Sequence, residues 1–138
     1  MQEYRKGAHS VFSIVSHTYF VTAYRRKCLT PVMIGRIAEV TARICVINDC
    51  IQLECDGEAD QVHFMLDLHP KIAPSTLLGS MKAASSRILR KEFEPELRPH
   101  FRNWKKGLWG DQLYIRSAGG APLETLKAYI NAHSRGSK

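Results

Sequence analysis

The chain has 138 residues, and its 20 Lys and Arg residues outnumber its 13 Asp and Glu residues, which gives a formal net charge of +7 at pH 7. This length fits a single domain, and a hydrophobic content of 44% is enough to fill one core, so wholesale disorder and a fibrous composition are excluded. A basic surface attracts phosphate backbones, which makes nucleic acid the leading expected partner, although charge alone is also compatible with a basic protein that has no such role.

Neither a membrane span nor secretion is expected. A helix needs roughly 20 apolar residues to cross a bilayer, and the longest N-terminal candidate, residues 11–23, is interrupted by polar side chains at positions 13 and 16–18. The cysteines include no Cys-x-x-Cys pair, which argues against a zinc knuckle, and a core of this size needs no disulfide. They are Cys28, Cys45, Cys50 and Cys55. A reduced cytoplasm is the expected location.

The first part of the chain predicts a strand followed by a helix. Residues 16–24 are rich in aromatic and β-branched side chains and favour a strand, which a charged turn at residues 25–27 closes. Thr30 and Pro31 are typical of an N-cap and a first helical residue, and apolar residues at helical spacing extend this helix to about Ile47.

Two further strands are predicted to form a hairpin. Apolar residues at positions 51, 53 and 55 alternate with polar ones, so these three are expected to face the core. After a turn at residues 57–60, the alternation resumes over residues 61–68. The mostly polar face of this second strand is expected to be exposed or to line a site, and it carries Gln61, His63, Met65 and Asp67.

The second half predicts a helix, a strand and a closing helix. Ser75 is expected to cap a helix that ends near Phe93, residues 94–106 are interrupted by prolines, and residues 113–117 form the last strand. Beyond a flexible joint at positions 119 and 120, Pro122 is expected to start the final helix, and residues 134–138 are expected to be a disordered tail.

Two pairs of residues are candidates for chemistry. Gln61 and His63 lie two residues apart on one predicted strand, so their side chains point the same way and can bind one metal ion. Tyr129 and His133 lie four residues apart on a predicted helix, which places a phenol beside an imidazole. Each pair also has a structural interpretation: a hydrogen-bonded strand histidine in the first, and a half-buried tyrosine with a histidine at a fraying helix end in the second.

Together with the segments around them, these residues resemble a known family. The chain is similar to the small single-strand DNA transposases of bacterial and archaeal insertion sequences, which are IS200-like members of the HUH nuclease superfamily with one catalytic tyrosine. The order and spacing of five segments carry the resemblance, and these segments are residues 19–27, 60–66, 81–87, 108–111 and 129–133. The resemblance covers most of the chain, so residues 1–138 are expected to form one HUH nuclease domain.

The resemblance implies an α+β fold, with a ferredoxin-like or RRM-like antiparallel sheet, helices on one face and a C-terminal catalytic helix. It also implies Tyr129 as the nucleophile and Mg²⁺ or Mn²⁺ as the cofactor. The family's strand motif is His, a hydrophobic residue and His, with a glutamine four residues after the tyrosine. In this chain Gln61 occupies the first motif position and His133 the last one, so the implied metal ligands are His63, His133 and Gln61, a permuted set.

The implied reaction is metal-assisted transesterification on single-stranded DNA with hairpin ends, through a 5′-phosphotyrosine intermediate. The resemblance also implies a homodimer in which the tyrosine helix can complete the partner subunit's site. Stacking surfaces for unpaired bases are expected at Phe101, Trp104 or Trp109, and DNA contacts at Arg25, Arg26, Lys27, Lys82, Arg87, Arg90, Lys105 and Lys106. Because Gln61 departs from the motif, the alternative is a catalytically impaired or domesticated relative that binds hairpin nucleic acid on the same fold.

Overall fold

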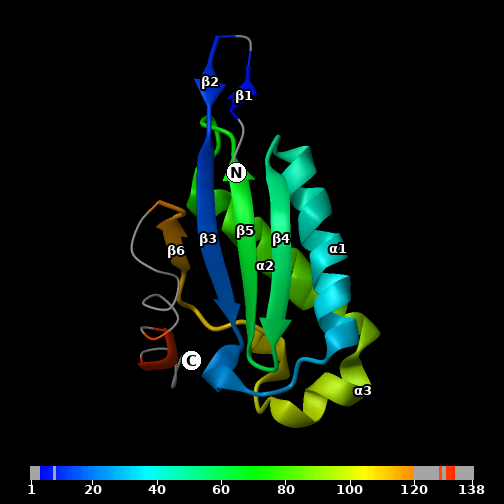
Figure 1. Cartoon of the computed structure of the whole chain (residues 1–138). Coiled ribbons are helices and arrows are strands. Elements are labelled where there is room, and N and C mark those ends of the chain that lie inside the picture. Colours follow the sequence, from blue (N-terminus) through cyan, green and yellow to red (C-terminus); the bar gives the residue numbers. More distant parts are fainter. Residues whose placement is uncertain (1–3, 8, 120–127, 129, 133–138) are drawn as a thin grey trace.

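A computed structural model describes residues 4–7, 9–119, 128 and 130–132. Its centre is a four-stranded antiparallel sheet in the order β4-β5-β3-β6, formed by β3 (Ile14–Val21), β4 (Ile51–Glu58), β5 (Gln61–Leu68) and β6 (Tyr114–Ser117). Two helices, α1 (Pro31–Ile47) and α2 (Pro74–Glu92), pack together against one face of this sheet (Figure 1). The strand-helix-strand-strand-helix-strand order with this sheet order is the ferredoxin-like arrangement, which confirms the predicted fold class.

Both long helices begin with a proline. Thr30 caps α1, since its side-chain oxygen accepts a hydrogen bond from the Met33 backbone N–H at 3.3 Å, and Pro31 takes the first helical position as predicted. For α2 the predicted cap at Ser75 is wrong. Ala73 is the N-cap, and its methyl side chain can accept no cap hydrogen bond. Pro74 occupies the first helical position, where its missing N–H costs nothing.

Strand β4 differs from the predicted alternation. Its register against β5 shifts between Gln52 and Glu54, so the strand contains a bulge at Leu53. The bulge reverses the phase of the first residues: Ile51 and Leu53 are 41% and 44% exposed rather than buried. Gln52 points instead toward α1, where Thr41 donates a 2.6 Å hydrogen bond to its side-chain oxygen. The core-facing role predicted for residues 51 and 53 is therefore wrong.

Strand β3 ends earlier than predicted. It stops at Val21, and a short 3-10 turn, η1 (Ala23–Arg25), follows. Tyr24 and Arg25 have φ angles of 59° and 53°, the left-handed region that side chains with a Cβ rarely adopt. Two such residues in succession turn the chain sharply, and the Arg25 side chain pairs with Asp60, which directly precedes β5.

Short elements complete the described chain: β1 (Arg5–Lys6), β2 (Val11–Phe12), α3 (Glu94–Leu97), η2 (Arg98–His100) and η3 (Trp104–Lys106). Residues 128 and 130–132 are helical, whereas the predicted helix start at Pro122 and the tail at 134–138 lie outside the described residues. Ile130 is fully buried against Tyr19, Val21 and Tyr114, on the sheet face opposite to α1 and α2. No helix within the described ranges is long and apolar enough to span a membrane.

Candidate active site and nucleic-acid interface

The sheet face opposite to the helices carries the predicted strand pair. Gln61 and His63 lie on β5 opposite Val21 and Tyr19 of β3, and both are buried, with 3% and 9% of their surface exposed. Tyr129 and His133 lie outside the described residues. Their described chain neighbours Ile130 and Asn131 contact this same face, so the structure brings the end of the chain to the predicted strand motif.

Asn131 links the chain end to Gln61. The Arg25 guanidinium donates to the Asn131 backbone oxygen at 3.0 Å and to its side-chain oxygen at 3.2 Å, and it also pairs with Asp60 at 3.2 Å. An arginine has only donors, so it fixes the oxygen of the Asn131 amide on its own side. The Gln61 Nε2 therefore donates to that same oxygen, at 3.0 Å. Arg25 thus orients the Gln61 amide through Asn131.

This orientation leaves the Gln61 Oε1 atom buried and without a hydrogen-bond partner in the described part of the chain. An unsatisfied buried acceptor is unfavourable unless it has a ligand. Amide oxygen is a hard ligand that suits Mg²⁺ and Mn²⁺, so Gln61 fits the implied cofactor. Within the described residues no group of three His, Cys, Asp or Glu is arranged to hold a metal ion. A metal site here therefore requires the amide or residues beyond those described.

His63 lies between two side chains from neighbouring strands. Its Nε2 is 2.9 Å from the Nδ1 of His17 on β3, and its Nδ1 is 3.7 Å from a carboxylate oxygen of Asp56 on β4. Burial lowers the pKa of His63, an effect that the carboxylate of Asp56 partly opposes. A lowered pKa favours the neutral imidazole, which is the form that can bind a metal.

His17 is a residue that the sequence reasoning missed. It lies in the predicted first strand, but only the pairing of β3 with β5 brings it beside His63, 46 residues further along the chain. Their rings are nearly parallel, with an interplanar angle of 20°. No local spacing rule could have found this contact, because register between strands is not written in either strand alone.

The expected DNA-binding residues differ in exposure and in their contacts with the rest of the protein. Some already have protein partners: Arg25 as described, Arg90, which donates to the Trp104 backbone oxygen at 3.0 Å, and Lys82, which donates to the Gly110 backbone oxygen at 2.7 Å. The exposed side chains are those of Lys27, Arg87, Lys105 and Lys106. The Nε of half-buried Arg26 has no hydrogen-bond partner among the described residues.

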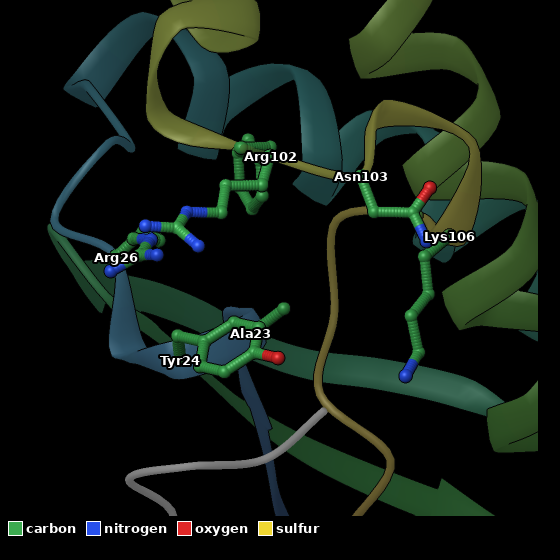
Figure 2. Close-up of a pocket in the computed structure, with 8 residues that line it drawn as sticks. Ala23, Tyr24, Arg26, Arg102, Asn103 and Lys106 are labelled. Atoms are coloured by element: carbon green, nitrogen blue, oxygen red, sulfur yellow. The ribbon is translucent and has the colours of Figure 1, made fainter.

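A basic and aromatic pocket opens at the end of β3 (Figure 2). Its volume is about 270 Å³, and it is lined by Ala23, Tyr24, Arg26, Phe101, Arg102, Asn103, Lys106 and Gly107. The Arg26 guanidinium lies over the Tyr24 ring, 5.1 Å from its centre, and Figure 2 shows Arg102 reaching toward Arg26 above that ring. A flat ring beneath cationic side chains can hold an unpaired base and its phosphate.

A shallower groove of about 570 Å³ runs between α2 and residues 106–111, with Lys82, Arg87, Arg90 and Lys106 along it. Two serines of α2 hold its far wall: Ser86 accepts from the Leu108 backbone N–H at 3.0 Å, and Ser85 accepts from the Trp109 indole N–H at 2.9 Å. Trp109 is only 7% exposed, so its predicted role as a stacking surface is wrong. Trp104 is partly exposed and lies beneath two arginines.

The fold is shared with solved transposases. A protein from Deinococcus radiodurans assigned as a transposase superposes over 96% of this chain and 99% of its own, with a TM-score of 0.82 and 20% identity. A REP-associated tyrosine transposase, solved bound to a REP hairpin, superposes over the whole of this chain and 76% of its own, with a TM-score of 0.54 and 12% identity. At these low sequence identities, the two comparisons show only a shared fold.

Sequence comparison gives the family. The family model described as "Transposase IS200 like" matches residues 10–133, and the chain therefore belongs to the IS200-like transposases. The transposase of insertion sequence element IS200 from Salmonella typhimurium is 26% identical over 114 residues, which are 80% of this chain and 74% of that protein. The IS200 transposase of Salmonella typhi has the same identity and coverage.

Proposed function

We propose that this transposase cuts and rejoins single-stranded DNA at the ends of an insertion sequence, with the Tyr129 hydroxyl as the nucleophile. The observation that carries the proposal is the 3.0 Å hydrogen bond from Gln61 to Asn131, which joins the strand motif to the segment that contains Tyr129 across 70 residues of sequence. Membership of the IS200-like family supports the same reaction.

The chemistry is a transesterification. The Tyr129 oxygen forms a bond to phosphorus, the bond from phosphorus to the 3′-oxygen breaks, and the departing oxygen takes a proton to become a 3′-hydroxyl. The 5′-phosphotyrosine keeps the phosphodiester energy, so attack by another 3′-hydroxyl rejoins strands without ATP. A divalent cation held by His63, Gln61 and His133 would neutralise charge on the non-bridging oxygens. The lowered pKa of His63 and the Gln61 oxygen that has no partner among the described residues support this ligand set.

The proposed substrate is single-stranded DNA with hairpin ends. The pocket around Tyr24 and Arg26 suits unpaired nucleotides, and the groove along α2 presents exposed cations to a phosphate backbone. The REP-associated transposase that shares this fold was solved with a hairpin, which supports a partner of the same kind here.

A covalent adduct tests the nucleophile. We expect purified protein with Mn²⁺ and a 5′-labelled or 3′-labelled hairpin substrate to form an adduct only with the fragment that carries the new 5′ end. Tyr129→Phe abolishes the adduct, whereas Tyr4→Phe, at a tyrosine that is 73% exposed, retains it as the matched control. An undiminished adduct in Tyr129→Phe would exclude this tyrosine as the nucleophile.

We further propose a homodimer in which the tyrosine helix can serve the partner subunit. Mixing two inactive variants, Tyr129→Phe and His63→Ala, tests this arrangement. If the tyrosine helix and the strand ligand His63 of one site come from different subunits, one site in the mixed dimer is intact and cleavage returns. A monomeric mass by light scattering, with no complementation, would contradict the dimer.

The second candidate function is hairpin binding without cleavage. It is favoured by one observation, the amide of Gln61 at the first position of the strand motif. Tight hairpin binding by the wild-type chain with no adduct under any divalent cation would establish this alternative. Restoration of the adduct by Gln61→His would then locate the defect at position 61.

A further inference from the structure

The contact between His17 and His63 is a second feature of this sheet face with chemical consequences. The two imidazoles come from adjacent strands, and the His17 Nδ1 and His63 Nε2 atoms are 2.9 Å apart. Two ring nitrogens approach this closely for one of two reasons: one donates a proton to the other, or both direct lone pairs at a shared cation.

The surroundings of His63 select the nitrogen that carries its lone pair. Its Nδ1 faces the Asp56 carboxylate at 3.7 Å, and a neighbouring carboxylate favours the tautomer with the proton on that nitrogen. A histidine whose second nitrogen faces a carboxylate is the arrangement found behind metal-ligating histidines, because the carboxylate fixes the tautomer. The Nε2 of His63 is then the free ligand atom, and it points at His17.

The separation fits a shared cation. Two ligand atoms about 2.1 Å from an octahedral ion, at right angles to each other, lie about 3.0 Å apart. A cation bound to the His63 Nε2 cannot avoid the His17 Nδ1, which already lies 2.9 Å from that atom. His17 must therefore either coordinate the cation or be displaced from its position in β3.

We propose that His17 is a ligand of the divalent cation, binding it through Nδ1 beside the Nε2 of His63. The inference rests on the metal-dependent function proposed above and adds a ligand to it. His17 supplies from β3 the second imidazole that Gln61 does not supply from β5, so a strand pair provides what a single strand motif would otherwise contain.

Manganese binding without DNA tests the proposal separately from activity. We expect the dissociation constant for Mn²⁺ to rise at least about tenfold in His17→Ala and in His63→Ala. It should stay within about twofold in His100→Ala, the matched control at an exposed histidine of η2. Electron spin echo modulation of bound Mn²⁺ should show one imidazole nitrogen fewer in His17→Ala than in wild type.

A wild-type measurement removes any dependence on the folding of the variants. In protein labelled with ¹⁵N-histidine, titration with diamagnetic Zn²⁺ should shift the His17 Nδ1 and the His63 Nε2 resonances together. If only the His63 nitrogen shifts, or if His17→Ala weakens binding without changing the number of coordinated nitrogens, His17 merely positions His63 and the inference is overturned. If His63→Ala binds Mn²⁺ as tightly as wild type, the metal site of the proposed function fails as well.

Discussion

The link between the chain end and the sheet is best tested at Asn131. Asn131→Leu removes the side-chain oxygen that accepts from both Arg25 and Gln61, while it leaves the backbone oxygen that also accepts from Arg25. Asn131→Asp is the matched control, because a carboxylate has the same size and can accept both hydrogen bonds.

The expected magnitude follows from the two bonds that are lost. A hydrogen bond from a charged donor such as Arg25 contributes about 2 kcal/mol, and a neutral one from Gln61 about 1 kcal/mol. Because Asn131 is exposed, leucine gains no burial that offsets this loss. Docking of residues 130–132 should therefore weaken by about 2 to 3 kcal/mol, which increases the undocked population by a factor of about 30 to 150.

Limited trypsin digestion measures that population. Trypsin cleaves after lysine, and the sequence has a lysine at position 127, directly before the described helical residues. A protease binds several residues on each side of the cleaved bond in an extended form, so residues 130–132 must leave the sheet before cleavage. The rate then follows the undocked fraction when redocking is faster than cleavage. Mass spectrometry identifies the fragment that ends at residue 127.

Two outcomes would refute this reasoning. Cleavage of Asn131→Leu at the wild-type rate would show that the two hydrogen bonds of the Asn131 side chain do not hold the segment on the sheet. Equal acceleration in Asn131→Asp would show the same, because the carboxylate keeps both acceptors.

Three other predictions address separate parts of the molecule. Lys82→Met should lower the free energy of unfolding by about 1 to 3 kcal/mol in chemical denaturation, because it leaves the Gly110 carbonyl without its donor. Exposed Arg87 is the comparison: Arg87→Ala should change the free energy of unfolding by no more than about 0.5 kcal/mol. It should also reduce the slope of log K against log salt concentration for hairpin binding by about 1. Equal stability loss in both would contradict the distinction. Gly57→Ala places a Cβ 2.6 Å from the Gln61 backbone oxygen and should cost about 1 to 3 kcal/mol, while Gly35→Ala, with open space in α1, should stabilise the protein by about 0.5 to 1 kcal/mol. Burial raises the pKa of Cys45 to about 12 and that of Cys28 to about 11, so these two buried thiols should react with a disulfide reagent at pH 8 only as fast as the protein unfolds, and prompt labelling would refute this.

Much of the fold could be predicted because its signals are local. Thr30 and Pro31 mark the start of α1, and the alternation over residues 61–68 marks β5, since both patterns lie within one element. The bulge at Leu53 escaped prediction because it depends on how β4 pairs with β5 rather than on β4 itself. The early end of β3 escaped for a similar reason: aromatic and β-branched composition favours a strand through Tyr24, but Arg25 gains its partners Asp60 and Asn131 only if the chain turns there.

The candidate site also has some features that local sequence patterns predict and others that depend on contacts between distant segments. Spacing alone places Gln61 and His63 on one face, and the burial of both residues shows that the face is not exposed at these positions, which was one of the two alternatives expected for it. Spacing cannot tell that Arg25, expected from its charge to contact DNA, is occupied by Asp60 and Asn131. Nor can it reveal His17 beside His63. Contacts across 35 to 106 residues depend on strand register and on docking of the chain end, which only the folded structure defines.

Acidic and basic side chains lie on different sides of the candidate site, so a divalent cation and a DNA phosphate would be attracted to different places. On the face that carries the candidate ligands, β4 places Glu54, Asp56 and Glu58 opposite Met65, His63 and Gln61 of β5. These carboxylates raise the local concentration of cations and repel phosphate, whereas the cations of the pocket at the end of β3 attract it. If the proposed function is right, a DNA strand would approach from the β3 side, and the proposed cation would lie between it and β4. The net charge of +7 describes the whole chain, whereas β4 beside His63 is acidic, so the proposed cation and the proposed phosphate substrate would be attracted to different parts of this protein.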